Sequence, residues 1–258
     1  MSRTTIALYG ATGRMGRAIR AALAEFPDLS LELCAAPSRD GASPPGCAWA
    51  TPDELLRDPS RIPEAAVVID VSLAAGTARL LEALEKAPRA FVSATTGLGE
   101  GEEGRIRALG SRTAVLRARN LSVGNAIALA MLEAVPDAAR GMAEEDVVEH
   151  HHSQKRDAPS GTALAWAAAM GAGRSDLVRP GAPATEPRKP GEIRIHSIRS
   201  GSVTGTHRAI YALPGETLEV VHTVSDRAVF ARGALLAARF LDGKPPGVYT
   251  FDQVLAST

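Results

Sequence analysis

The sequence predicts an α/β protein in two parts, a doubly wound parallel sheet and a smaller α+β region with a mixed sheet. Short, continuous apolar runs such as residues 66–71 are typical of parallel strands buried on both faces. Over roughly the first 120 residues these runs alternate with helix-like stretches, which is the pattern of a parallel sheet covered by helices. Between residues 192 and 225, turn residues separate three strand-like runs, which predicts an antiparallel or mixed sheet.

The first element is a strand that leads through a glycine-rich turn into a helix. Residues 6–9 are apolar, and Gly10, Gly13 and Gly16 follow in a G-x-x-G-x-x-G pattern. Apolar side chains at helical spacing indicate the helix: Met15, Ile19, Ala22 and Phe26. This context predicts a dinucleotide-binding turn. Because the spacing departs from the commoner G-x-G-x-x-G, a tight strand-to-helix turn without a ligand remains the alternative.

The residues after the second strand, at 31–36, indicate which dinucleotide the turn would bind. A dinucleotide fold places its ribose-reading residue about 20 residues beyond the glycines, and Ser38 and Arg39 lie there. An acidic residue would pair with the 2′-hydroxyl of NADH, whereas Arg39 suits the 2′-phosphate of NADPH, with Arg14 in support. We therefore expect NADPH to be preferred and NADH to be possible. The alternative is that Arg39 is an ordinary solvent-exposed loop charge.

The rest of the first region continues the alternation of strands and helices. A loop at residues 42–46 leads to a short helix at 51–56. Further strands are expected at residues 66–71, 89–94 and 113–116, and helices at 77–86 and 101–109. Polar turns follow two of these strands, at 95–97 and 120–125. Open α/β sheets bind ligands at such carboxyl ends of strands.

After residue 125 the pattern changes, which predicts a second domain. A helix is expected at residues 126–139, a strand at 146–149, a helix from Ala163, and a long Pro- and Gly-rich loop over 174–191. The strands of the second sheet are expected at 192–197, 203–212 and 216–225, and a last amphipathic helix at 227–241. One domain is expected to bind the dinucleotide and the other the substrate.

Residues 149–162 concentrate polar groups for which a hydrophobic core has no use. Ser160 is a favourable N-cap, so Gly161 and Thr162 lie in the first turn of the following helix. The free N–H groups of that turn and the positive end of the helix dipole form a site for a carboxylate or phosphate. Lys155 looks unpaired and could add a positive charge, and a nearby histidine could exchange a proton. The segment therefore predicts a site for reacting an anionic small molecule.

Composition disfavours several classes of protein. The net charge is zero and 4% of the residues are aromatic, which disfavours a nucleic-acid partner recognised by charge and base stacking. No apolar stretch approaches the ~20 residues of a membrane helix, and no signal region is recognised. We therefore expect a cytoplasmic protein without a membrane partner. Cys34 and Cys47 form neither a disulfide framework nor a metal-binding pattern, and Cys34 is expected to be buried.

The adjacent histidines at 150–152 do not predict a metal site. Consecutive side chains point to opposite faces of a strand, or about 100° apart on a helix, so they rarely bind one ion. No zinc-like spacing accompanies them, and no metal is expected. We expect His150 to be packed and hydrogen-bonded, and three further histidines to be ordinary sheet residues: His196, His207 and His222. A serine hydrolase is disfavoured because Ala158 stands where a nucleophile elbow at Ser160 needs glycine.

The pattern His-His-x-x-Lys-x-Asp-Ala-Pro-Ser-Gly-Thr-Ala at residues 151–163 resembles the signature of the dihydrodipicolinate reductases (4-hydroxy-tetrahydrodipicolinate reductases), enzymes of the diaminopimelate and lysine pathway. Similarity extends over essentially the whole chain, at residues 10–16, 94–97, 120–124 and 230–234. The resemblance implies NAD(P)H-dependent reduction of 4-hydroxy-tetrahydrodipicolinate, a cyclic dicarboxylate, to tetrahydrodipicolinate.

The resemblance also implies how the chain is divided. A Rossmann-like dinucleotide-binding domain is expected to comprise residues 1–122 and 226–258, because the C-terminal helix of the family returns to that domain. Residues 123–225 are expected to form the α+β domain for substrate binding and oligomerisation. Its mixed sheet is expected to build a homotetramer.

Individual residues receive roles from the same resemblance. The catalytic histidine corresponds to His151 and the catalytic lysine to Lys155. The groups that hold the substrate correspond to His152, Lys155, Ser160, Gly161 and Thr162. The cofactor contacts correspond to three turns and one arginine: Gly10, Ala11, Thr12, Gly13, Arg14 and Met15; Arg39; Ala94, Thr95 and Thr96; and Ala118, Arg119, Asn120 and Leu121.

Four residues depart from the usual pattern of the family. Ala94 stands where glycine is frequent, Leu121 where phenylalanine is, and Arg119 where a small residue or proline is usual, which leaves the cofactor contacts of these turns open. Ser38 replaces an acid of members that accept NADH well, which strengthens the expectation of NADPH. Two alternatives remain: another nicotinamide oxidoreductase acting on a different dicarboxylate, and a non-catalytic dinucleotide-sensing protein.

Overall fold

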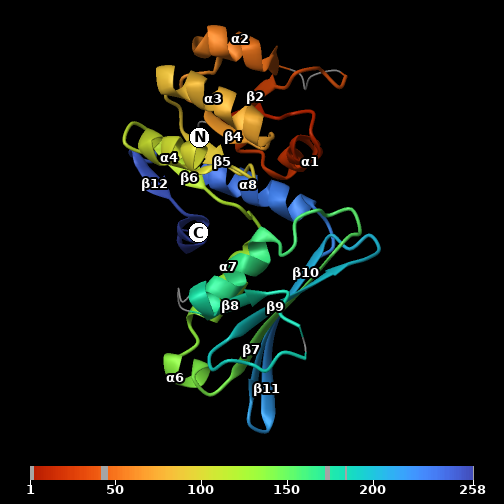
Figure 1. The fold of residues 1–258 in the computed structure, drawn as a ribbon. Helices are drawn as coiled ribbons and strands as arrows, with labels where there is room; N and C mark the ends of the chain where they lie inside the picture. The colour runs from red at the N-terminus through yellow and green to blue at the C-terminus, as the bar shows by residue number, and fades with distance from the viewer. Residues whose placement is uncertain (1–2, 42–45, 172–174, 184, 258) are drawn as a thin grey trace. The chain divides into compact units, whose positions relative to one another are not determined.

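The computed structural model describes residues 3–41, 46–171, 175–183 and 185–257, which form two compact units (Figure 1). The first unit comprises Met1–Leu121 and Arg227–Thr258, and the second comprises Ser122–Asp226. These boundaries differ by one residue from those expected from the sequence. Most of the loop expected at 42–46 lies outside the described residues.

The first unit contains a seven-stranded sheet in which all neighbouring strands are parallel. Its order is β12-β6-β5-β4-β1-β2-β3, so the chain winds outward in one direction from β1 and in the other from β4. The predicted doubly wound parallel sheet is therefore confirmed. The strands are β1 (Thr4–Tyr9), β2 (Leu29–Ala35), β3 (Ala48–Ala50), β4 (Val67–Asp70), β5 (Phe91–Ser93), β6 (Ala114–Arg117) and β12 (Gly247–Tyr249).

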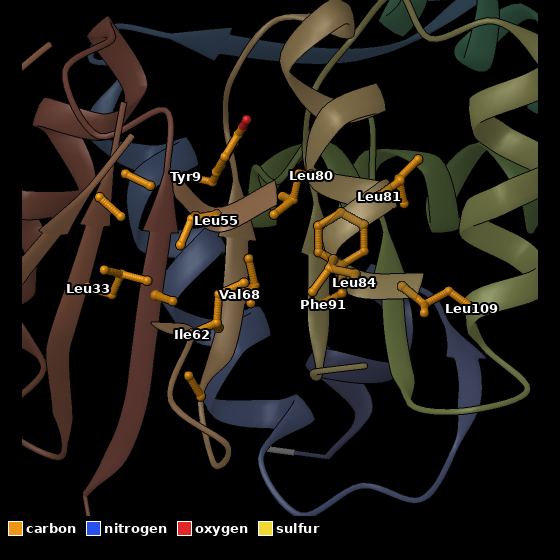
Figure 2. Packing of buried hydrophobic residues seen from close by; sticks show 14 of the residues in the cluster. Tyr9, Leu33, Leu55, Ile62, Val68, Leu80, Leu81, Leu84, Phe91 and Leu109 are labelled. Atoms are coloured by element: carbon orange, nitrogen blue, oxygen red, sulfur yellow. The ribbon is translucent and has the colours of Figure 1, made fainter. Parts of the chain in front are cut away.

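Helices cover both faces of this sheet because successive strand residues point to opposite faces. One face packs against α2 (Pro52–Arg57), α3 (Ala74–Lys86) and α4 (Glu100–Leu109). Figure 2 shows Leu80, Leu81 and Leu84 of α3 in one cluster with Val68 and Phe91 of the strands. On the other face, α8 (Ala228–Leu241) contacts β1, β4, β5 and β6 and packs against α1 (Arg14–Ala22).

Helix α8 thus returns the C-terminal part of the chain to the first unit. A Cβ atom at Gly233 would lie 1.8 Å from the carbonyl oxygen of Leu121, so this helix approaches the backbone closely. The following strand β12 pairs with β6, and helix α9 (Phe251–Ala256) comes after it. Neither element was predicted, and β3 was also missed. Strands of three residues are too short to show a period, and only their pairing defines them.

The second unit is built on a five-stranded mixed sheet of order β11-β10-β7-β9-β8, which confirms the predicted sheet type. Its antiparallel part consists of β7 (Glu144–His151), β10 (Gly205–Leu213) and β11 (Glu216–Val224). Strand β9 (Ile193–Arg199) runs parallel to β7 and to β8 (Val178–Pro180). The segment 174–191 was predicted as a loop. That prediction is wrong at β8, while residues 174 and 184 lie outside the described part. Helix α7 (Gly161–Met170) packs on β7 and β9 through Trp166.

The single helix predicted over residues 126–139 is wrong. The structure has α5 (Val123–Glu133), which Ser122 caps, and a separate short helix α6 (Asp137–Arg140). Pro136 has an extended backbone at the N-cap of α6. Proline disfavours a helical conformation in the residue before it, so α5 ends before Pro136. The alanine-rich composition of both segments concealed this break.

Arg140 closes the ends of two helices from a buried position. Arg140 is only 4% exposed. The guanidinium donates five hydrogen bonds to backbone carbonyls at the ends of α5 and α7: those of Leu132, Glu133, Val135, Ala169 and Met170. The last carbonyls of a helix have no partner within the helix, and a cation stabilises the negative end of the dipole.

Two further observations concern the membrane and the cysteines. Within the described ranges, no helix combines the length and the apolar character needed to cross a membrane. Cys34 is buried as predicted, and both cysteines are free, with 3.4 Å between Sγ of Cys34 and Sγ of Cys47.

Candidate active site

Strand β7 ends in the residues around which the site is built. Glu149 and His151 share one face because they are two positions apart, and His150 points to the other face. Glu149 is fully buried and His151 is 8% exposed. His150 is half-buried, and its Nε2 lies 2.8 Å from Oγ of Ser200. His150 is therefore packed and hydrogen-bonded, as predicted, and His151 faces the interior of the unit.

Glu149 connects His151 to the start of α7. Its Oε2 lies 2.8 Å from Nδ1 of His151, and its Oε1 accepts a 2.9 Å hydrogen bond from the backbone N–H of Ser160. Ser197 and Arg199 of β9 donate to the same Oε1, each at 2.7 Å. Burial alone would raise the pKa of Glu149, but its hydrogen-bond donors outweigh burial and hold that pKa well below its ordinary value. The carboxylate is therefore ionised at neutral pH.

His207 of β10 lies in the same buried cluster. It is 4% exposed, and its ring centre lies 5.1 Å from that of His151 in an edge-on arrangement. Its Nε2 is 3.1 Å from Oγ of Ser160. Burial, reinforced by the neighbouring His151, lowers the pKa of His207 to about 3, so this ring is neutral at physiological pH. His207 was expected to be an ordinary sheet residue, and its contact with Ser160 was not predicted.

Helix α7 begins at the predicted place. Ser160 is the N-cap, and its Oγ accepts a 3.1 Å hydrogen bond from the N–H of Ala163. Gly161 opens the first turn and is exposed, and a Cβ atom placed on it would have no neighbour within 4 Å. Thr162 follows in the same turn. The free N–H groups and the dipole at this end of α7 can bind a carboxylate.

Lys155 lies between β7 and α7 and has a partner. Its Nζ is 2.8 Å from both carboxylate oxygens of Asp157, so the expectation of an unpaired lysine is wrong. The side chain of Asp157 is 60% exposed. An exposed ion pair of this kind contributes at most about 1 kcal/mol. A carboxylate of a ligand can therefore replace Asp157 at the ammonium group.

The structure brings the predicted substrate residues into one part of the second unit. His152 is half-buried, directly after β7, and its backbone N–H donates to the carbonyl oxygen of Val203 at 2.8 Å. His151, Lys155 and the first turn of α7 lie close together in the sequence, because β7 ends at His151 and α7 begins at Gly161. Their contact with a substrate stays a prediction.

The residues expected to bind the cofactor follow four strands of the first unit. Gly10–Met15 come after β1, Arg39 after β2, Ala94–Thr96 after β5, and Ala118–Leu121 after β6. In a parallel sheet these carboxyl ends meet at one edge, and the strand order reverses there between β1 and β4. Thr95, Ala118 and Leu121 are buried, whereas Thr96 and Arg119 are exposed. This edge is where a doubly wound sheet binds ligands.

The glycine turn has the close packing that a dinucleotide-binding turn needs. Gly10 has a φ of +87°, which favours glycine, and a Cβ atom at Gly16 would lie 2.3 Å from the carbonyl oxygen of Gly10. Gly13 is the N-cap of α1 and provides no side-chain hydrogen bond to the helix. The N–H groups in the first turn of α1 are therefore suited to a phosphate.

Arg39 is exposed at the predicted ribose end of this edge, with its guanidinium carbon 5.5 Å from the ring centre of Trp49. The neighbouring Asp40 pairs instead with Arg17 at 2.9 Å and Arg20 at 2.8 Å. Hydrogen bonds from Arg20 and Arg17 hold the pKa of Asp40 below its usual range. Asp40 is therefore occupied by two other arginines and does not neutralise Arg39.

Glu149, His151 and His207 also place potential metal ligands within 4.8 Å of one another. The guanidinium of Arg199 already lies 2.7 Å from the Glu149 carboxylate, and His207 Nε2 lies beside Ser160 Oγ. A metal ion would have to compete with these contacts in a site that already holds a positive charge. We interpret the cluster as a hydrogen-bond network.

Models of one protein family match almost the whole chain. The model described as "Dihydrodipicolinate reductase, N-terminus" matches residues 4–121, and the one described as "Dihydrodipicolinate reductase, C-terminus" matches residues 125–255. The chain belongs to the dihydrodipicolinate reductase family. The predicted family and the prediction of an oxidoreductase are therefore confirmed.

Known members of the dihydrodipicolinate reductase family are similar over their full length. A protein named 4-hydroxy-tetrahydrodipicolinate reductase from Thermomicrobium roseum is 40% identical and covers 97% of this chain and 98% of its own length. One of the same name from Rubrobacter xylanophilus is 36% identical, with both chains covered completely. The dipicolinate-bound dihydrodipicolinate reductase from Paenisporosarcina sp. TG-14 has the same fold, with a TM-score of 0.75, 17% identity and coverage of 96% of this chain and 97% of its own.

Some residues of the site were not predicted from the sequence. Glu149 could have been found, because it stands two positions before His151 on a strand and must share its face. Arg199 and His207 left no local signal, since they reach the site only through the pairing of β9 and β10 with β7. Asp157 was read as part of a motif and not as the partner of Lys155.

Proposed function

We propose that this protein catalyses the NADPH-dependent reduction of 4-hydroxy-tetrahydrodipicolinate to tetrahydrodipicolinate in the diaminopimelate and lysine pathway. The observation that carries the proposal is the link that Glu149 makes between His151 and the N-terminus of α7. It joins a proton-carrying group to a site for a carboxylate in a member of this family. In this proposal the first unit binds the dinucleotide and the second binds the cyclic dicarboxylate.

The second unit binds the substrate through its two carboxylates. One carboxylate accepts hydrogen bonds from the first turn of α7, at Gly161 and Thr162, and from Lys155, which exchanges Asp157 for the substrate. His152 provides a further contact to the dicarboxylate. Fixing the ring in this way lowers the barrier by reducing the entropy that the reaction step must lose, a contribution of up to several kcal/mol.

The chemistry divides between the cofactor and the chain. The reaction removes the 4-hydroxyl group of the substrate as water and adds a hydride and a proton. A bound nicotinamide would supply the hydride, to a ring carbon conjugated with the C=N bond. His151 holds the proton that the ring takes up, and Lys155 stabilises negative charge nearby and is the alternative donor. General acid catalysis of this kind contributes about 10²–10⁴-fold to the rate.

The residues of the first unit fit a nicotinamide dinucleotide. The glycine turn leaves no room for side chains at Gly10 and Gly16, and α1 starts without a side-chain cap. The N–H groups of Gly10–Met15 suit the diphosphate. Arg39, with Arg14, suits a 2′-phosphate, and the turns at 94–96 and 118–121 provide the remaining contacts.

The cofactor preference depends on Arg39. In the Arg39→Ala variant we expect kcat/KM for NADPH to fall about 10- to 100-fold, because hydrogen bonds to charged groups contribute ~1.5–3 kcal/mol, while kcat/KM for NADH changes little. Steady-state kinetics with both cofactors measure this. Arg107→Ala, which removes an exposed arginine of α4, serves as the control. Equal or better efficiency of the wild type with NADH would contradict the preference.

Lys155 should affect both binding and rate. In Lys155→Ala we expect KM for the dicarboxylate to rise about tenfold or more, because a hydrogen bond to a charged group is lost, and kcat to fall as well. Lys189→Ala removes another lysine of the same unit and should leave both constants unchanged. If Lys155→Ala raised KM no more than this control, Lys155 would not bind the carboxylate.

A coupled assay distinguishes the proposed function from its alternatives. The enzyme that precedes this step in the pathway supplies the unstable substrate, and consumption of NADPH and NADH is followed in parallel by absorbance. Consumption that depends on the coupling enzyme supports the proposal. Consumption only with other dicarboxylates would indicate a different oxidoreductase, and cofactor binding without consumption would indicate a dinucleotide sensor.

The proposal extends to assembly and location. We expect a homotetramer built through the sheet of the second unit, in the cytoplasm, where NADPH-dependent biosynthesis takes place. Val221 of the edge strand β11 and Ile198 of β9 point to the same face of this sheet and are 51% and 45% exposed, which supports a partner on that face. Sedimentation equilibrium tests the assembly, and a monomer would exclude it.

A further inference from the structure

We propose that Glu149 is the positioning residue of His151: its carboxylate keeps the imidazole proton on Nδ1, so that Nε2 is the nitrogen that exchanges a proton with the substrate. The inference rests on the proposed function, since it concerns the group that delivers the proton. It goes beyond that function because it assigns a role to a residue that need not touch the substrate.

The carboxylate of Glu149 is held asymmetrically. Oε1 accepts three hydrogen bonds, from the Ser160 N–H at 2.9 Å and from Ser197 and Arg199 at 2.7 Å each. Oε2 lies 2.8 Å from Nδ1 of His151. Rotation of the carboxylate would break the three contacts at Oε1 of this fully buried side chain. Oε2 is therefore fixed in front of the imidazole.

This arrangement determines the tautomer of His151. The contact is close but not aligned as a hydrogen bond, and neither Oε2 nor Nδ1 has another hydrogen-bond partner among the described residues. An anionic oxygen 2.8 Å away attracts an N–H and repels the lone pair of a bare nitrogen, so the hydrogen is favoured on Nδ1. The other nitrogen, Nε2, faces Gly205 at the start of β10. A Cβ atom there would lie 3.0 Å from Nε2, so the missing side chain leaves space beside this nitrogen. Glycine at this position keeps the proton-carrying nitrogen accessible.

The negative charge closest to the imidazole of His151 is that of Glu149. The other charged or titratable side chains beside the ring come from the neighbouring strands: Arg199 of β9 and His207 of β10. His207 is neutral, and Arg199 is bound at the far oxygen of the Glu149 carboxylate.

The test replaces Glu149 by glutamine, which preserves the shape but can present an N–H group to the imidazole. The ¹⁵N shifts of the His151 ring report the tautomer without substrate: we expect hydrogen on Nδ1 in the wild type and on Nε2 in Glu149→Gln. An Nε2–H tautomer in the wild type would overturn the proposal, even if the variant fails to fold. We expect kcat of the variant to fall about 10- to 10³-fold with little change in KM, as for residues that orient a catalytic group.

A double variant separates positioning from a structural role. In a His151→Ala background, Glu149→Gln should have no further effect on kcat, because the two residues act as a unit. Losses that multiply in the double variant would show that Glu149 does not act through His151.

A matched control lies on the same strand. Asp146 also pairs with a histidine, since its Oδ1 is 2.8 Å from Nε2 of His196. Asp146→Asn should leave kcat and the tautomer of His151 unchanged. If the wild type reduces the substrate and His151→Ala is impaired, but Glu149→Gln is fully active, the inference fails while the proposed function stands. If the wild type is inactive with every dicarboxylate, the proposed function fails, and the tautomer measurement still decides the orientation of His151.

Discussion

The His151→Ala variant is expected to reduce the dicarboxylate about 10²- to 10⁴-fold more slowly than the wild type, with a smaller effect on KM. This is the usual scale for loss of a general acid. His151 is the group that the fold prepares for this task, because the buried carboxylate of Glu149 lies 2.8 Å from its Nδ1. Steady-state kinetics in the coupled assay measure the effect.

The neighbouring histidine provides the control for this prediction. His150 points to the opposite face of β7 and contacts Ser200, so His150→Ala should retain nearly full activity. Because His151→Ala removes a buried side chain that packs against His207, it also loses stability, by about 0.5–3 kcal/mol. Kinetics are therefore measured well below the unfolding transition. Full activity of His151→Ala would remove His151 from the mechanism.

Arg140→Ala is expected to lower the free energy of unfolding by at least about 3 kcal/mol, the largest stability effect we predict. The substitution leaves five backbone carbonyls at the ends of α5 and α7 without their donor, and each hydrogen bond from a charged group contributes ~1.5–3 kcal/mol. It also removes the cation at the negative ends of two helix dipoles. Chemical denaturation followed by circular dichroism measures the loss.

Two further variants serve as comparisons for the loss of stability in Arg140→Ala. Arg140→Lys retains the charge but has one nitrogen in place of three, so it should recover only part of the stability. Arg239→Ala removes an exposed arginine that pairs with Asp28 on the surface, and it should cost less than about 1 kcal/mol. If Arg140→Ala unfolded at the same denaturant concentration as Arg239→Ala, the carbonyls would have found other partners and the helix ends would not depend on Arg140.

Much of the fold could be predicted because its signals are local. The continuous apolar run at residues 66–71 is typical of a buried parallel strand, and Thr51 and Ser160 marked the starts of two helices. The elements that were missed depend on partners far away in the chain. Strand β12 exists through its pairing with β6, and the break before Pro136 was hidden by the helix propensity of the alanines around it.

For the site, too, residues that are adjacent in the sequence could be predicted, and residues that are distant could not. The motif at 151–163 indicated the histidine, the lysine and the helix start, because these residues are adjacent in sequence. The groups that set their chemistry are not adjacent: His207 comes 56 positions after His151, and only the register of β10 against β7 brings them together.

The return of α8 to the first unit has a consequence for synthesis on the ribosome. All strands of the parallel sheet except β12 emerge first, then the whole of Ser122–Asp226, and only then the helix that covers one face of that sheet. Until then, the nascent chain exposes apolar strand surface, while the inserted unit already has all its residues. Such surfaces favour aggregation, so chaperones should protect the newly made N-terminal half until translation is complete.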